Sequence, residues 1–379
     1  MKVLHLPTTV GGNPQRLSHA ERKIGLDSSS LAFHQNFFQF SADTVLFKQN
    51  QFFRNEIKRW FLIINELKEH DVVHYNFGLF ASPFRKFHLT NQRSGWRRRL
   101  YNLFYGWPFE GADLKLLERS PTVIAVTYQG DDARQGDYCR ANYPIHHVHE
   151  VEAGYYSDYS DSLKRERIAR FDRYAHLMYA LNPDLLNVLP QRCRFLPYAA
   201  VDLEEWEFIG VSENDDVPHL IHAPSDRSIK GTKYVEDAVE RLRSEGVRVR
   251  FTLVEGMSND EAKKIYQDAD LLVDQLLAGW YGGLAVELMA LGKPVVCYLR
   301  QKDLVHVPRE MCDDMPVIDA TPKSIYEVLK DWLTNRRQEL RQRGVESRKY
   351  VEKWHDPLKI AAGLKKDYQT AHARIASEA

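Results

Sequence analysis

A glycine-rich turn at residues 279–283 and the acidic side chain of Glu287 are the strongest sign of chemistry in this sequence of 379 residues. The turn follows an apolar run at 269–274 and begins a short predicted helix, and a second apolar run follows at 295–299. The first amide groups of a helix bind anions, most often phosphate. Glu287 comes one helical turn later, where its carboxylate can accept hydrogen bonds from a ribose. The segment therefore predicts a strand, a glycine turn, a helix and a strand around a phosphate.

The spacing of apolar residues supports this helix. Leu284, Leu288 and Leu291 recur at helical intervals and give one buried face, and Gly292 can end the helix. A plain β-α-β unit, whose glycines serve only tight packing, would share the short pattern.

A second group of candidate residues lies at 226–231, between a predicted strand and a predicted helix. It contains two cations, Arg227 and Lys230. Arginine makes forked contacts with phosphate oxygens, and lysine acts as a point charge. The loop is therefore a candidate part of a diphosphate site, and the alternative is a solvated charged loop.

Two further groups follow strands in the first half of the chain. Gly11 and Gly12 form a glycine loop after the first predicted strand, although a glycine pair alone is a weak signal. His74 ends another strand and could face a ligand, but a lone histidine in such a place more often has a structural role.

Gln129 and Asp131 follow a third apolar run at 121–128. A glutamine can bond a sugar hydroxyl but cannot transfer protons as an imidazole does. Asp131 and its neighbour Asp132 could meet an acceptor, or they could only cap the next helix.

The whole stretch 279–296 resembles the donor-site signature of family 4 glycosyltransferases with the GT-B fold. That signature reads Glu-Gly-Phe-Gly-Leu, three residues, Glu, and then a small-residue helix ending in Gly-x-Pro-Val-Val. Gly282 matches its second glycine and Glu287 its second glutamate. The first glutamate, which contacts the donor sugar in that family, falls on Gly279.

The resemblance extends to other positions. Lys230 and the following glycine match a pair that holds the donor diphosphate. The family's arginine falls on Ser225, and Arg227 is the nearby substitute. Gln129 stands where the family has a histidine beside the transferred sugar, and residues 11–12 match a glycine loop near donor phosphate and acceptor.

The resemblance implies a GT-B architecture, which means two Rossmann-like, doubly wound α/β domains facing a cleft. Alternating predicted strands and helices in both halves agree with it. We expect an N-terminal acceptor-side domain at 1–200, a C-terminal nucleotide-sugar donor domain at 201–355, and a helix at 356–379 that returns to the N-terminal domain.

The composition of the chain argues against several classes of protein and of binding partner. Lys plus Arg equals Asp plus Glu, 52 each, which argues against a nucleic-acid binder. The four cysteines are too few for a disulfide scaffold and favour a reducing cytosol. The histidines at 146–149 have no further ligands at metal-binding spacing, so we expect no metal site. No apolar run approaches the ~20 residues of a membrane span.

A basic and aromatic stretch at 93–109 has the composition of a segment that binds an anionic membrane surface. Such binding would suit a lipid-linked acceptor and a peripheral location. The alternative is an amphipathic helix packed on the N-terminal domain. A predicted helix at 54–67 has one apolar face, made of Ile57, Phe61, Ile64 and Leu67.

The implied function is a metal-independent glycosyltransferase that moves a sugar from a nucleotide-sugar to a glycan, lipid-linked or other hydroxyl acceptor, with retention. It needs no cofactor besides the donor substrate. The missing glutamate and histidine leave two alternatives, a non-catalytic GT-B protein that binds nucleotide-sugar or glycan as partner of an active enzyme, and a sugar-nucleotide epimerase. The predicted site residues are Gln129, Asp131 and Lys230 for catalysis, and Gly11, Gly12, Arg227, Lys230, Gly282, Gly283, Leu284 and Glu287 for the donor.

Overall fold

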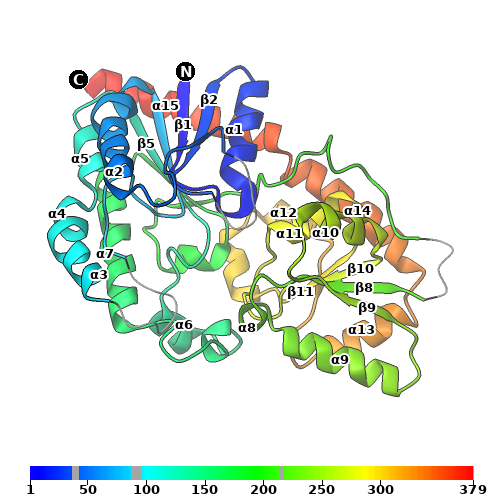
Figure 1. The fold of residues 1–379 in the computed structure, drawn as a ribbon. Helices are drawn as coiled ribbons and strands as arrows, with labels where there is room; N and C mark the ends of the chain where they lie inside the picture. The colour runs from blue at the N-terminus through cyan, green and yellow to red at the C-terminus, as the bar shows by residue number, and fades with distance from the viewer. Residues whose placement is uncertain (36–41, 87–94, 213–216, 379) are drawn as a thin grey trace. The chain divides into compact units, whose positions relative to one another are not determined.

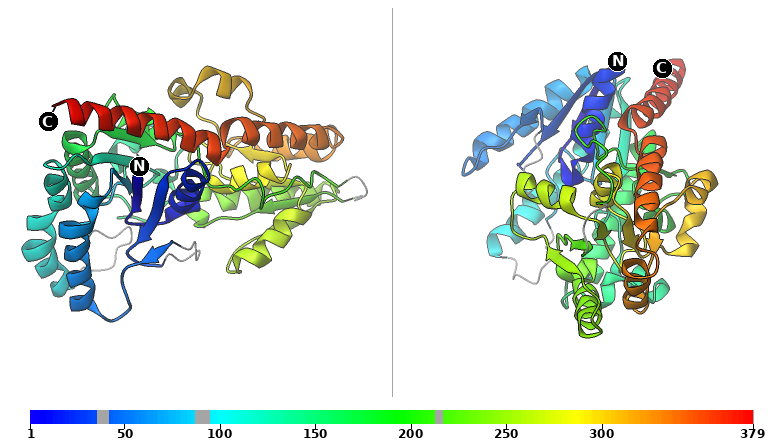
Figure 2. Two further views of the ribbon diagram at one scale, coloured as in Figure 1. Left: turned by 90° about the horizontal axis from the view of Figure 1, so that it is seen from above. Right: turned by 90° about the vertical axis from the view of Figure 1, so that its right-hand side faces the viewer.

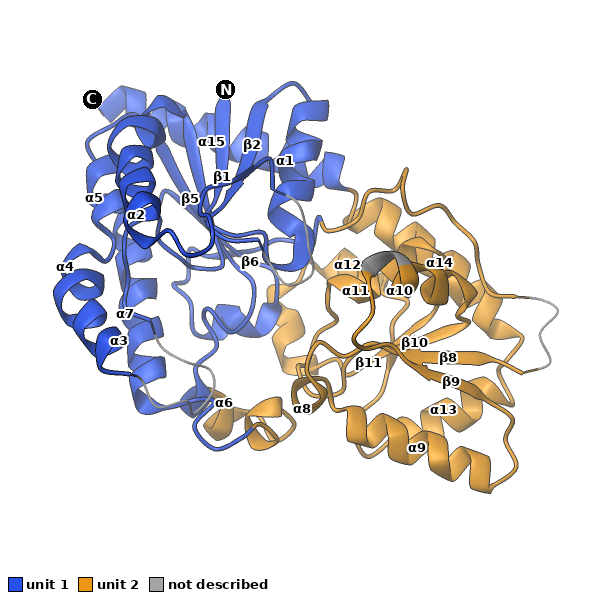
Figure 3. Cartoon of the chain, in the orientation of Figure 1, with its two compact units in different colours: residues 1–138, 152–199, 357–379 blue, residues 139–151, 200–356 orange. Residues whose placement is uncertain are grey.

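Two parallel sheets organise the chain (Figure 1). A computed structural model describes residues 1–35, 42–86, 95–212 and 217–378. The chain forms two compact units (Figure 3). Unit 1 comprises Met1–Tyr138, Glu152–Ala199 and Pro357–Ala379, and unit 2 comprises Cys139–Val151 and Ala200–Asp356.

Unit 1 is built on a seven-stranded sheet of order β3-β2-β1-β4-β5-β6-β7, in which every neighbouring pair is parallel. Every residue of the central strands β4 and β5 is buried, as expected for a parallel sheet covered on both faces. The strands are β1 (Lys2–Leu6), β2 (Asp27–Ala32), β3 (Thr44–Val45), β4 (Val72–Asn76), β5 (Val123–Tyr128), β6 (Leu177–Ala180) and β7 (Arg194–Phe195).

Helices cover this sheet, and π-helical turns at Leu62–Glu66 and Asn102–Gly106 extend two of them. The helix α6 (Gly136–Asn142) contains the boundary between the units. The helices of unit 1 are α1 (Asn13–Lys23), α2 (Phe52–Phe61), α3 (Trp96–Tyr101), α4 (Trp107–Phe109), α5 (Ala112–Leu117), α7 (Asp158–Tyr174) and α15 (Pro357–Glu378).

The last helix, α15, packs beside α1 on the sheet of unit 1 (Figure 2). Its residues Ile360, Ala361 and Leu364 share one apolar core with Val3 of β1 and Leu17 of α1. The prediction that the C-terminal helix returns to the N-terminal half is confirmed.

The apolar face predicted at 54–67 lies on α2 and the turns that follow it, and it is exposed over most of its length. Leu67 is fully buried, but Ile57, Phe61 and Ile64 are exposed to solvent. Periodicity shows that a helix has an apolar face but not whether another element covers it.

Unit 2 has a five-stranded sheet of order β12-β11-β10-β8-β9, again with only parallel pairs. Its strands are β8 (His219–His222), β9 (Arg250–Leu253), β10 (Leu271–Val273), β11 (Val295–Cys297) and β12 (Ile318–Asp319). Its helices are α8 (Arg227–Lys230), α9 (Thr232–Ser244), α10 (Asn259–Asp268), α11 (Gly283–Ala290), α12 (Arg309–Asp313), α13 (Ile325–Leu333) and α14 (Glu339–Trp354).

The strand orders place a topological switch point in each sheet, between β1 and β4 in unit 1 and between β8 and β10 in unit 2. At such points the connections leave in opposite directions, and ligands bind beyond the carboxyl ends of the strands. The loops that follow these strands contain residues 7–12 and 77–78 in unit 1, and 223–231 and 274–282 in unit 2. Half of the ten predicted site residues lie in these segments, namely Gly11, Gly12, Arg227, Lys230 and Gly282.

Residues 139–151, which the sequence placed in the N-terminal domain, belong to unit 2. The guanidinium of Arg300 lies 3.8 Å from the ring centroid of Tyr143, and its Nη2 donates to the carbonyl of Ile145 at 3.1 Å. Glu150 accepts hydrogen bonds from Lys233 and Tyr234 of α9. A nearly buried arginine needs such partners, and this segment supplies them.

No helix in the described ranges combines the length and the apolar character that crossing a membrane requires.

Candidate functional site

The start of α11 presents amide groups to the switch point of unit 2. Gly282 is the N-cap residue, and its N–H donates to the Asp274 carboxylate at 2.7 Å. The first amides of a helix have no acceptor within the helix. Those of Gly283 and Leu284 have no hydrogen-bond acceptor among the described residues, and both residues are half-buried. These two amides can therefore bind an anion.

Lys230 brings a positive charge to the same place. Its Nζ donates to Oδ1 of Asp274 at 3.0 Å and to Oε1 of Gln275 at 2.7 Å. A Cβ added to Gly282 would lie 3.3 Å from this Nζ, so the ammonium stands against the first residue of the helix start. An ammonium has three protons, and these contacts use two of them. The third can reach an anion bound by the amides.

Asp274 connects Lys230 to the start of α11. Its side chain is fully buried, and one oxygen accepts from Lys230 while the other accepts from the Gly282 amide. The carboxylate therefore fixes the lysine at the helix start. From the sequence we expected Asp274, the acid at the end of the strand before the glycine turn, to help hold the donor sugar. In the structure both of its carboxylate oxygens accept hydrogen bonds from Lys230 and Gly282.

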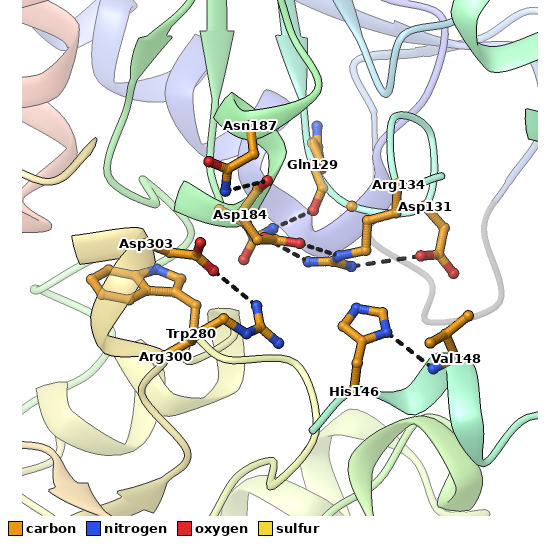
Figure 4. Close-up of polar contacts among 12 residues, drawn as sticks. Gln129, Asp131, Arg134, His146, Val148, Asp184, Asn187, Trp280, Arg300 and Asp303 are labelled. Atoms are coloured by element: carbon orange, nitrogen blue, oxygen red, sulfur yellow. Dashed lines mark hydrogen bonds and ion pairs between the residues drawn. The ribbon is translucent and has the colours of Figure 1, made fainter. Parts of the chain in front are cut away.

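Gly279, where the family signature has its first glutamate, has no room for a side chain. Its φ is +84°, and an added Cβ would lie 2.6 Å from Cζ of Arg300. Arg300 is itself fixed, because its Nη1 donates to Asp303 at 2.8 Å (Figure 4). The packing of Arg300 therefore excludes a glutamate at this position.

The predicted loop at 226–231 contains the one-turn helix α8, whose N-cap Asp226 accepts from the amides of Ser228 and Ile229. Arg227 is about half exposed and pairs with Glu255 at 2.6 Å and with Glu236 at 3.3 Å. A pocket of about 290 Å³ lies beside this helix. Its lining residues are Glu150, Arg227, Ser228, Gly231, Thr232, Lys233, Glu236 and Leu277.

Glu287 lies half-buried in the second turn of α11. Tyr266 of α10 is close enough that the Glu287 charge adds to burial in raising the pKa of its hydroxyl. The structure thus brings Lys230, Gly282, Gly283 and Leu284 together, with Glu287 one turn further along the same helix.

His222 ends β8 next to this group. Its Nδ1 lies 2.7 Å from the carbonyl oxygen of Val273 and its Nε2 lies 2.9 Å from the hydroxyl of Thr232. Burial lowers the pKa of His222 to about 4, so the ring is neutral at pH 7. A neutral ring fixes the start of α9 to the strand ends without adding charge.

In unit 1 the glycine loop and Gln129 come together. Gly11 and Gly12 have φ values of 65° and 73°, and Gly12 caps α1. A Cβ on Gly11 would lie 3.7 Å from Oε1 of Gln129. The Gln129 Nε2 lies 3.5 Å from Oδ1 of Asn76 at the end of β4, a long contact that a ligand can replace.

Asp131 is held by several partners in this unit. Its carboxylate accepts from the hydroxyls of Tyr155 at 2.6 Å and Tyr156 at 2.7 Å, and Nη1 of Arg134 lies 3.6 Å away. Arg134 also pairs with Asp184 at 2.7 Å (Figure 4). These contacts place Asp131 in a structural network.

Asp132 closes the turn that contains Gln129. Its carboxylate accepts from the amides of Gln129 and Gly130, and burial raises its pKa to about 6. The sequence left open whether Asp132 meets an acceptor or caps the next helix, and in the structure its carboxylate accepts from amides of its own turn. No sequence pattern indicated that the pKa of Asp132 is raised toward neutrality.

The lone histidine His74 has a structural role. It is fully buried in β4, with Nδ1 2.7 Å from the hydroxyl of Tyr368 in α15 and Nε2 2.7 Å from that of Thr127. Burial holds the pKa of His74 well below its usual range. This histidine links the returning helix to the sheet.

The histidines at 146–149 also make structural contacts. Nδ1 of His146 accepts from the amide of Val148 (Figure 4), and Nε2 of His149 lies 2.8 Å from the carbonyl oxygen of Tyr143. The described part of the chain contains no group of three His, Cys, Asp or Glu side chains arranged to hold a metal ion.

Comparison with known proteins identifies solved structures of similar architecture. No model of a known protein family matches the sequence, and no curated protein matches it. A solved sucrose-phosphate synthase from Thermosynechococcus elongatus matches with a TM-score of 0.58 and 13% identity, over 99% of this chain and 100% of that chain. The Anabaena protein HepE, solved with UDP-glucose, matches with a TM-score of 0.57 and 11% identity, over 98% of this chain and 100% of that chain.

The fold is GT-B. Identities this low show the fold alone, so the chemistry of this chain has to be argued from its own residues. Within the GT-B fold, unit 2 carries an amide-and-lysine group that suits an anion, and unit 1 carries an amide side chain beside a glycine loop. The first group is suited to a phosphate and the second to a hydroxyl.

Proposed function

We propose that the protein is a glycosyltransferase that moves a sugar from a nucleotide-sugar to a glycan, lipid-linked or other hydroxyl acceptor, with retention and without a metal. The observation that carries this proposal is the position of Lys230. Its ammonium lies against Gly282, beside the amides of Gly283 and Leu284. The solved GT-B proteins that resemble this chain include a sucrose-phosphate synthase and a protein bound to UDP-glucose, which supports a sugar-nucleotide substrate.

In this proposal the cation and amides act on the leaving group. When the bond between the sugar and the diphosphate breaks, negative charge develops on the phosphate oxygens. Fixed donors aimed at that charge stabilise the transition state without having to reorganise. Lys230 and the amides of Gly283 and Leu284 supply such donors, and Asp274 keeps the lysine in place.

Arg227 would also bind the diphosphate, after its guanidinium separates from its acidic partners. Its pairs with Glu255 and Glu236 are exposed, and exposed ion pairs contribute only ~0–1 kcal/mol. A diphosphate can therefore compete for its guanidinium. Glu287 would accept hydrogen bonds from the ribose hydroxyls, since it lies one turn beyond the proposed phosphate site.

Unit 1 would position the sugar and the acceptor. Gln129 can donate to and accept from sugar hydroxyls, and the glycine loop at 11–12 lets a ligand approach the backbone. Asp131 would act by orienting this loop through its tyrosine and arginine contacts. The carboxyl of Asp132, with its pKa of about 6, stays held by amides of the turn.

Incubation with a panel of nucleotide-sugars, with detection of released nucleoside diphosphate, tests the proposal. Release by the wild type, lost in Lys230→Ala and kept in Lys349→Ala, is the expected result. Lys349 is an exposed lysine on α14 of the same unit and provides a matched control. Binding without turnover would instead indicate a non-catalytic partner protein, and an altered sugar would indicate an epimerase.

A further inference from the structure

An apolar stripe of α2 is exposed at the surface of unit 1. Phe53, Ile57, Phe61 and Ile64 follow one another at helical spacing, and Phe53 is 82% exposed and Ile57 69%. Large apolar side chains standing singly at a surface are ordinary, but a continuous stripe marks an interaction site.

A second stripe lies on the neighbouring segment formed by α3, the following π-helical turn and α4. Its members are Trp96, Leu100, Phe104 and Trp107, of which Phe104 is 68% exposed and Trp96 67%. We call the two stripes together the apolar–basic surface.

Side-chain contacts form a seam between α2 and this neighbouring segment. Tyr105 donates to Glu56 at 2.8 Å and accepts from Trp60 at 2.7 Å, and Trp60 also packs edge-to-face on Phe109. Later residues of α2 thus meet later residues of its neighbour, so the helices run in the same direction. On α2, Ile57 and Phe61 each follow a seam residue by one position. On the neighbouring segment Phe104 precedes the seam residue Tyr105 by one, which in right-handed parallel helices places these exposed side chains on one side of the seam.

The exposed charged residues within 52–64 and 96–109 are all basic. Arg54, Lys58, Arg97 and Arg99 are exposed. The one acidic residue within 52–64 and 96–109 is Glu56, which is largely buried and pairs with Arg59 at 2.9 Å. An anionic partner therefore complements this surface.

We propose that the apolar–basic surface binds the anionic surface of a lipid bilayer. A helix face with Trp and Phe beside Lys and Arg suits the interface between headgroups and acyl chains. The exposed aromatic side chains present roughly 800 Å², more than the ~300–600 Å² of the largest patch on a typical monomer. A two-fold dimer would place this surface against itself and bring like charges together. The inference is independent of the donor site, which lies in unit 2.

Cosedimentation with phosphatidylcholine vesicles, with and without phosphatidylserine, tests the proposal. The wild type should bind vesicles that contain phosphatidylserine, and binding should weaken as salt is raised from about 0.05 to 0.5 M because salt screens exposed charges. Arg97→Ser/Arg99→Ser should lower the affinity about 25-fold, since each cation near such a surface contributes about fivefold. Phe53→Ser/Phe104→Ser should lower it at least tenfold on the same vesicles.

Matched controls separate this surface from a general effect of charge or apolarity. Arg309→Ser/Arg374→Ser removes two exposed cations elsewhere, and Val305→Ser removes an apolar side chain that is 80% exposed. Both should bind vesicles as the wild type does, and all variants should keep the wild-type affinity for nucleoside diphosphate. Absence of binding at low salt would overturn the proposal. The proposal would also be overturned if the wild type did not bind vesicles but formed a dimer, and if Phe53→Ser/Phe104→Ser converted that dimer to monomers.

Discussion

The two glycine turns of this protein have similar positions in their sheets but different surroundings. In unit 1, Gly11 and Gly12 follow β1, and the nearest atom to an added Cβ on Gly11 is the amide oxygen of Gln129 at an ordinary contact distance. In unit 2, Gly279 lies against the buried guanidinium of Arg300, and Gly282 lies against Lys230. The first turn has room around a neutral polar group, whereas the second is closely packed by charged groups.

This difference separates two uses of glycine. At Gly279 the absent side chain makes room for protein, because Arg300 fills the space. At Gly11 it leaves space that a ligand can use. A glycine-rich signature in a sequence does not distinguish these cases, and the following predictions test whether the two turns differ as described.

The largest effect is expected for Gly279→Ala. The new Cβ would displace Arg300 from Asp303, and the residue would hold a left-handed φ, so the free energy of unfolding should fall by roughly 4 kcal/mol. Gly11→Ala adds a Cβ in ordinary contact and should cost about 1 kcal/mol, from backbone conformation alone. Urea denaturation of both variants measures the difference. Equal losses would show that Arg300 can move aside without cost.

Acid should destabilise the fold through His222. Its pKa of about 4 lies below the ~6.5 of an unfolded chain, so the unfolded state binds the extra proton first as the pH falls. Stability from this group is full above pH 6.5 and is lost between 6.5 and 4, by roughly 3 kcal/mol in all. His222→Gln should remove this part of the pH dependence in urea titrations between pH 7 and 4. An unchanged slope would mean that His222 is protonated equally in both states.

Lys230→Ala should weaken binding of a nucleoside diphosphate by about 100-fold, since a hydrogen bond to a charged group contributes about 1.5–3 kcal/mol. Gln129→Ala should leave that affinity unchanged and reduce transfer, because unit 1 is proposed to hold sugar and acceptor. Calorimetric titration measures the affinity, and thermal melting of each variant shows that it is folded. A comparable loss of nucleoside-diphosphate affinity in both variants would contradict the proposal that the turn in unit 2 binds the diphosphate and the turn in unit 1 does not.

Glu287→Ala should lower nucleoside-diphosphate affinity by about 10- to 100-fold, with Glu287→Gln between it and the wild type. A 2′,3′-dideoxyribose analogue should bind the wild type and the alanine variant almost equally, because its missing hydroxyls remove the same contact. If the alanine variant melts earlier yet still discriminates between the two ligands, Glu287 only stabilises its helix.

The helix at the donor site could be predicted from local pattern. The glycine turn, the leucine spacing and Gly292 together fix α11, and the structure begins and ends it at Gly283 and Ala290. The contact between Lys230 and Gly282 could be anticipated only through the family resemblance, since 52 residues separate them in the chain. Whether these residues bind a donor stays a prediction.

Other features depend on long-range packing and leave no local signal. Arg300 reaches Tyr143 and Ile145 across more than 150 residues, so nothing near 139–151 indicates that this segment joins unit 2. The same arginine occupies the space that a side chain at Gly279 would need. The exposed apolar stripe of α2 has the same periodicity as a buried apolar face. Residue spacing defines a face of a helix but does not show whether another element packs against it.

The discontinuous make-up of both units has a consequence for synthesis on the ribosome. Ile145 emerges 155 residues before Arg300, its partner, which at ~5–20 residues per second is a delay of roughly 10–30 s. The sheet of unit 1 is likewise incomplete until α15 packs on it, and α15 is synthesised after the whole of unit 2. A nascent chain therefore lacks the Arg300 partner of Ile145 until residue 300 is made, and the apolar surface under α15 stays uncovered until residues 357–378 are made. Both units should complete their folding late and close together in time, rather than the N-terminal unit first.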